Sequence, residues 1–149
     1  MPFITFGRVL FAVFFIYSGV ARFVGMQATI DFITAKVTIP AMIDPYVRMV
    51  ENTTGAKYPQ LLAIAIGAIE ILAGLMIALN LGARFFAILM IIFVMVGTFY
   101  LNDFWNQAPP DNAATIIDAL KNLSIIGALF MIAGHGPGRR AAEPAYGDV

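Results

Sequence analysis

The chain has 149 residues, of which 60% are hydrophobic and 12% are charged, and its mean hydropathy is +0.85. Soluble domains carry about 25% charged residues, so this chain has too few polar residues to cover a water-facing surface. We therefore predict a membrane protein. Nine Lys and Arg balance nine Asp and Glu, which gives no reason to expect nucleic acid as a partner.

The residue types that commonly hold redox cofactors are scarce. The chain has no cysteine and a single histidine, His135. This excludes disulfides, cysteine-bound iron–sulfur clusters and a bis-histidine haem within the chain. No Ser-His-Asp, metal-ligand or phosphate-cradling pattern is present either. We expect no catalytic residues, no metal and no activity from the isolated chain.

Four apolar stretches are long enough to cross a bilayer, which takes about 20 residues. They run over about residues 3–23, 58–80, 83–101 and 112–133, and Gly, Pro or Asn separates them. The runs are too long for strands and do not alternate. The sequence thus predicts an all-α integral membrane four-helix bundle in a single domain, residues 1–134, with a C-terminal tail at 135–149.

The first stretch has an alternative reading as a cleaved secretory signal peptide. Gly19-Val20-Ala21 loosely resembles a small-residue cleavage site, but no basic residue precedes Arg8. A retained first span is the reading we favour.

The long connection at residues 24–57 contains two short amphipathic helical segments. Residues 29–37 place Ile30 and Ile33 on one side, and Asp44-Pro45 is typical of a helix start, with that helix continuing to about residue 52. We expect both segments to lie on the bilayer surface or to cap one end of the bundle, an ordinary ordered loop being the alternative. The second and third spans are joined by a very short connection and should form a tight helical hairpin.

Basic residues near the span ends indicate the orientation in the membrane. Arg8, Arg84, Arg139 and Arg140 fall on one side in short segments. The same number on the other side is spread over the long connection. Both termini are therefore expected in the cytoplasm.

Two ionisable residues fall about ten positions into their spans, Glu70 in the second and Lys121 in the fourth. A charge at the centre of a span costs about 2.5–3.5 kcal/mol on insertion scales. We expect a Glu70–Lys121 pair across the bundle, because the second and fourth spans run parallel. The pair could fix helix register, or line a cavity with Asn122 as a quinone, lipid or proton site. Alternatively, Lys121 pairs with Asp118 and Glu70 is protonated.

Two helical stripes accompany these charges. Small residues flank Glu70 on its own face and should let another helix approach closely. In the first span, Arg8 and Arg22 are structural polar residues near the two ends, from which they can reach the head groups. The stripes are Ala63, Gly67, Glu70 and Gly74, and Arg8, Ala12, Phe15, Gly19 and Arg22.

Several short motifs, in this order and spacing, resemble the bacterial DoxX family. They are Gly7-Arg8, Ser18-Gly19 before Arg22, Glu70 with Gly74, Leu81-Gly82-Ala83-Arg84, and Lys121-Asn122-Leu123 running on to Gly136-Pro137-Gly138-Arg139. The resemblance implies a four-helix protein of the bacterial cytoplasmic membrane, with family names linked to quinone-dependent sulfur oxidation. The histidine that the family often has near the end of the third span is replaced by Tyr100-Leu101-Asn102 and the residues that follow.

Three functions fit these observations. The first is an accessory or anchor subunit of a larger membrane complex, redox or photosynthetic, without its own cofactor and adjacent to quinone. The second is a subunit that itself forms a quinone or proton site around Glu70 and Lys121, within a quinone-linked oxidoreductase. The third, a small oligomeric transporter, is less favoured because four helices leave little lumen.

Overall fold

The computed structural model describes residues 2–102, 104–110 and 112–135, and every regular element in that part of the chain is a helix. Four helices are long and apolar enough to cross a membrane. They are α1 (Pro2–Val24), α4 (Tyr58–Ala78), α5 (Ala83–Leu101) and α6 (Asn112–Gly134). The predicted all-α membrane fold is confirmed. The predicted tail lies, from residue 136 onwards, outside the described residues.

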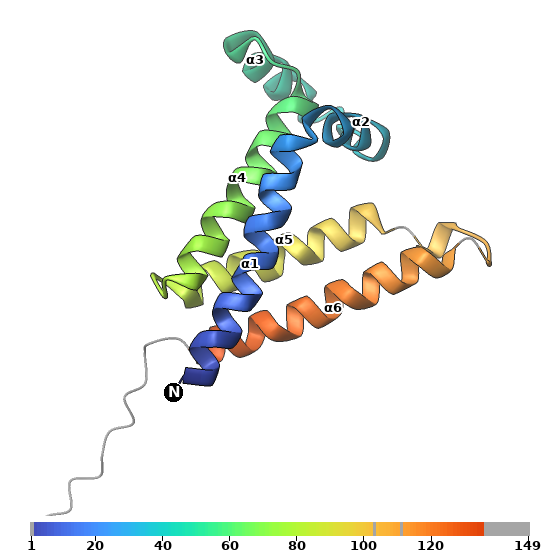
Figure 1. Cartoon of the computed structure of the whole chain (residues 1–149). Coiled ribbons are helices and arrows are strands. Elements are labelled where there is room, and N and C mark those ends of the chain that lie inside the picture. Colours follow the sequence, from blue (N-terminus) through green and yellow to red (C-terminus); the bar gives the residue numbers. More distant parts are fainter. Residues whose placement is uncertain (1, 103, 111, 136–149) are drawn as a thin grey trace, which may run out of the picture.

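The four spans form two pairs, α1 with α4 and α5 with α6 (Figure 1). The pairs come together where α1 begins, α4 turns into α5, and α6 ends. From there they diverge, so that the other ends of the two pairs lie far apart. We call the shared region the closed end. The α4–α5 connection is the expected tight turn, yet α4 packs mainly on α1, and α5 mainly on α6.

The hydrophobic core lies toward the closed end. All four spans contribute, but α5 has no buried residue beyond Ile91, and Leu129 is the one buried residue of α6. The farther halves of α5 and α6 therefore bury no residue within the described part of the chain. The core residues are Ala12, Phe15, Ala73, Ile77, Ala87, Met90, Ile91 and Leu129.

Two short helices follow α1 and lie at the far end of the α1/α4 pair (Figure 1). Helix α2 (Met26–Lys36) packs on α4 and buries Ile33, whereas α3 (Asp44–Thr54) buries no residue. Glu51 of α3 accepts a hydrogen bond from the Tyr58 backbone N–H at 2.7 Å. Since the first N–H groups of a helix have no partner within it, this contact caps the start of α4. The expectation of two short helices in the first connection is confirmed.

Glycines bring α1 and α4 into close contact. A Cβ added to Gly19 would lie 2.6 Å from the Gly67 carbonyl oxygen, and one added to Gly74 would lie 3.1 Å from the Ala12 carbonyl oxygen. Backbones can approach this closely only where side chains are absent. The two small-residue stripes seen in the sequence thus face each other across the α1–α4 contact.

We expect Gly19→Ala to lower the free energy of unfolding by about 1–3 kcal/mol, the usual cost of overpacking, because the obstructing atom belongs to the backbone. Gly127→Ala in α6 is the matched control, since a Cβ there meets nothing within 4 Å. Unfolding of both variants in detergent micelles, followed by circular dichroism, tests this. Equal stability of the two variants would contradict the close α1–α4 contact.

Candidate functional site

Glu70, in the middle of α4, is held by two residues of α1. Its Oε2 accepts hydrogen bonds from Arg22 Nε at 2.9 Å and Ser18 Oγ at 3.0 Å, and its Oε1 accepts one from Arg22 Nη2 at 3.2 Å. Glu70 is only 4% exposed. Three donors thus converge on one buried side chain, and the Arg22 contact is the two-pronged geometry that a guanidinium forms with a carboxylate.

Helix geometry explains why Arg22 can reach Glu70. Arg22 lies in the last turn of α1, and helical side chains point back toward the N-terminus of their helix. Its guanidinium is thereby directed from the end of the span toward the level of Ser18. Gly67, one turn from Glu70, packs against Gly19, which brings the two helix axes close enough for the contact.

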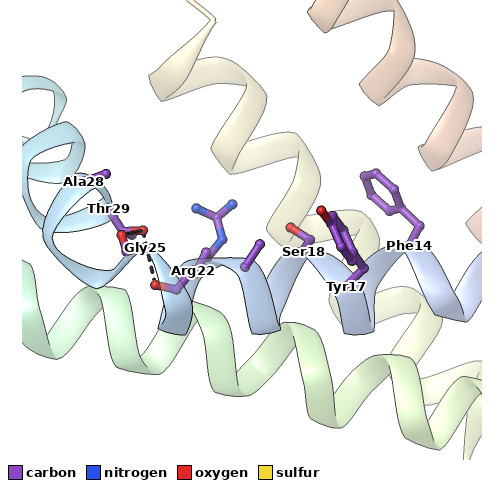
Figure 2. Close-up of a pocket in the computed structure, with 8 residues that line it drawn as sticks. Phe14, Tyr17, Ser18, Arg22, Gly25, Ala28 and Thr29 are labelled. Carbon is purple, nitrogen blue, oxygen red and sulfur yellow. Dashed lines mark hydrogen bonds between the residues drawn. The ribbon is translucent and has the colours of Figure 1, made fainter.

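A shallow groove of about 430 Å³ lies beside this ion pair, between α1 and the start of α2. Figure 2 shows Phe14, Tyr17, Ser18 and Arg22 along α1, with Thr29 of α2 beyond the end of that helix. Thr29 Oγ1 donates to the Gly25 and Arg22 carbonyl oxygens at 3.1 and 3.4 Å. The Arg22 side chain is 30% exposed, so a ligand in the groove would meet a guanidinium, a hydroxyl and two aromatic rings.

The expected Glu70–Lys121 pair is wrong. Lys121 forms its ion pair with Asp118 of the same helix, with Nζ 3.0 Å from Oδ1. Both side chains are open, at 67% and 59% exposure. Of the alternatives considered from the sequence, the Lys121–Asp118 contact is the one observed, while Glu70 pairs with Arg22. Arg22, for which we expected a contact with the head groups, is thus engaged with Glu70 across the α1–α4 contact.

Counting positions along the sequence overestimated the depth of Lys121. Asn102, just after α5, donates to the Thr115 carbonyl oxygen at 3.4 Å, so Thr115 marks the level at which α5 ends. Lys121 lies six residues further along α6, about 9 Å at 1.5 Å per residue. That rise is about a third of the thickness of a hydrocarbon core, so Lys121 lies nearer the end of its span than its sequence position suggests, but still within the span, and its side chain points back toward Asp118.

The remaining candidates are engaged in contacts between helices. Asn122 Nδ2 donates to Thr98 Oγ1 at 2.9 Å, which joins α6 to α5. Arg8 Nη1 donates to Asn80 Oδ1 at 2.7 Å, which joins the start of α1 to the α4–α5 turn. Among the described residues, no group of three or more His, Cys, Asp and Glu could hold a metal ion.

Sequence reasoning missed the partner of Glu70, although the signal was available. Arg22 and Glu70 both stand on stripes that include glycine, one in the first span and one in the second. A carboxylate on a small-residue stripe of one span and an arginine one turn from a glycine on a stripe of another predict a close, charge-paired helix contact. Ser18, one turn before Arg22, could have been added by the same argument.

Comparison with known families gives a match over the part of the chain that holds this site. The family model described as DoxX matches residues 3–103. The chain belongs to the DoxX family. Ser18, Arg22 and Glu70 lie within the match, whereas α6 with its Lys121-Asn122 motif lies outside it. Searches among curated proteins and among solved structures found no match. With its four apolar spans, this DoxX protein is a multi-pass membrane protein.

We expect Glu70→Gln to lower the free energy of unfolding by about 1–3 kcal/mol, because it breaks a buried, charge-assisted contact without changing side-chain size. Asp44→Asn in α3 is the matched control. It removes the same charge from an exposed ion pair with Arg48 outside the four spans, for which the expected loss is below about 1 kcal/mol. Unfolding in detergent micelles measures both. If the Asp44 variant lost as much stability as the Glu70 variant, the assignment of Glu70 as the buried structural charge would be wrong.

Proposed function

We propose that this DoxX protein is an accessory or anchor subunit of a larger complex, redox, photosynthetic or respiratory, in the bacterial cytoplasmic membrane. The observation that carries the proposal is the Asp118–Lys121 pair on the outer surface of a spanning helix. Charged side chains in contact with acyl chains are costly, and within spans they usually face protein or water. In the proposed complex, a helix of a partner protein covers the pair and separates it from the acyl chains.

The surroundings of the pair favour a protein partner over lipid. Ser124 follows Lys121 by one turn and is also exposed, so α6 offers polar groups over two turns. Helix α6 buries one residue within the chain, Leu129, whereas α4 buries seven. A helix with polar groups and little internal packing is suited to association with another helix.

A photo-crosslinking amino acid at position 124, introduced in native membranes, tests the subunit role. We expect one discrete adduct with a different polypeptide, identified by mass spectrometry. The control is the same probe at Ile92 of α5, an apolar position with 56% exposure, where we expect lipid adducts only. The additional changes Asp118→Leu and Lys121→Leu should weaken the adduct at 124. Lipid adducts alone at 124, or adducts only with a second copy of this chain, would contradict the proposal.

A second candidate function is direct quinone binding, and the groove beside Arg22 favours it. Tyr17 and Phe14 supply ring surfaces, and Arg22, whose guanidinium has more N–H groups than the two that bond Glu70, supplies a donor that a quinone carbonyl oxygen can accept from. The group would supply electron transfer when bound, and the chain's own residues would hold and orient it. We expect no turnover of quinols by the isolated chain, since the cofactor chemistry would reside in the partner.

The quinone content of protein purified in mild detergent tests this second candidate. We expect Tyr17→Ala to lower the amount of co-purified quinone severalfold, because the ring lines the groove. Tyr46→Ala in α3 is the matched control, since the two tyrosines are similarly exposed, at 74% and 71%. Quinone at the level of the bulk lipid in the unmodified protein would exclude a site here.

The orientation remains part of the proposal, with both termini in the cytoplasm. The start of α1 and the end of α6 lie at the same end of the molecule (Figure 1), and Arg8 and Arg84 are located there, as the distribution of basic residues requires. Reporter fusions after residue 149 and within the α2–α3 connection test it. Activity of a periplasm-specific reporter at residue 149 would reverse the assignment.

A further inference from the structure

A second cavity lies at the closed end and is lined by a positively charged side chain, that of Arg8, which has no role in the proposed function. It has a volume of about 300 Å³ and lies between the first turns of α1, the α4–α5 turn and the end of α6. Its walls are mainly apolar, with Ile4, Phe11, Met131 and Ile132 among the lining residues. Arg8 and Asn80 are the polar groups inside it, and His135 lies at the end of α6.

The hydrogen bonding of Arg8 is incomplete. Nη1 donates to Asn80, but Nε is buried and has no partner, and it is the one buried side-chain nitrogen or oxygen of which this holds among the described residues. Burying a donor of a charged group without an acceptor is unfavourable. An anionic ligand in the cavity would compensate the guanidinium that lines it.

No carboxylate of the described residues can serve as that anion. The acidic residues there belong to α2, α3, the middle of α4 and the first half of α6, all away from the closed end. Each forms a contact of its own: Asp31 with Gln27, Asp44 with Arg48, Glu51 with Tyr58, Glu70 with Arg22, and Asp118 with Lys121. Arg84, at the start of α5, adds a second positive charge at this end.

The depth of the cavity matches a lipid headgroup. Arg8 lies six residues after the start of α1, about 9 Å along the helix, and Asn80 belongs to the turn between two spans. Ile4 and Met131 are exposed at the outer wall, so the cavity opens to the acyl region. We propose that it binds the phosphate of an anionic phospholipid, with the start of an acyl chain along the apolar wall.

Fluorescence quenching by brominated lipids tests this in the full chain. Trp105 is the only tryptophan, so Trp105→Phe gives a silent background for a new tryptophan. Met131→Trp places the probe at the cavity, and Phe130→Trp, at similar exposure of 60% against 65%, places it outside. Both proteins are reconstituted in phosphatidylcholine vesicles that contain brominated phosphatidylglycerol.

At the cavity position we expect quenching that corresponds to about fivefold enrichment of the anionic lipid over its bulk fraction. One basic residue near an anionic membrane surface favours binding by about this factor. The outside position should follow the bulk composition. Arg8→Gln should abolish the enrichment and Arg84→Gln should preserve it, although both remove one charge at the same end. Equal quenching at the two positions would overturn the proposal.

Two further arms keep the result decisive. The first applies if Arg8→Gln does not fold, as judged by the loss of its helical circular dichroism signal. The protein that retains Arg8 is then also reconstituted with brominated phosphatidylcholine in place of brominated phosphatidylglycerol. Equal enrichment of the two lipids would then contradict recognition of an anionic headgroup. Inorganic phosphate at millimolar concentration should not reverse the quenching, and its doing so would identify a soluble phosphate site in place of a lipid site.

Discussion

The structure depends on one constraint: a carboxylate in the middle of an apolar span must find a partner inside the protein. Glu70 meets this requirement with Arg22 and Ser18 of α1. A charge left in acyl chains would cost several kcal/mol, so the contact determines which helix packs on α4 and in what register. The extensive α1–α4 pairing, rather than a symmetric arrangement of four helices, follows from it.

Close backbone contact makes the α1–α4 pairing possible. Gly19, Gly67 and Gly74 let α1 approach α4, and the apolar core is then completed near Ala12 and Ile77 toward the closed end. The α5/α6 pair shares this core and little else, so much of its apolar surface lies outside the chain's own packing. A helix pair attached at one end and exposed along the rest is consistent with a subunit that associates with other membrane proteins.

The fold was predictable because hydropathy and chain breakers determine spans almost directly. The α5 bounds match the predicted residues 83–101, and the two short helices were expected. The partner of Glu70 was not found, because depth was counted along the sequence from the start of each span. Spans need not begin at the same level: Thr115 of α6, not Asn112, faces the end of α5. Lys121 therefore lies nearer the end of its span than Glu70 would require of a partner, and it pairs with Asp118. Relative helix position is a tertiary property that hydropathy does not encode.

The central claim is that Glu70 is coupled energetically to Arg22 and not to Lys121. Two double-mutant cycles on the free energy of unfolding in detergent micelles measure this directly, with Glu70→Gln combined in turn with Arg22→Gln and Lys121→Gln. The account predicts a coupling energy of about 1–3 kcal/mol for Glu70 with Arg22, as for residues in direct contact, and additivity within about 0.5 kcal/mol for Glu70 with Lys121. Additivity in the first cycle together with coupling in the second would contradict the account.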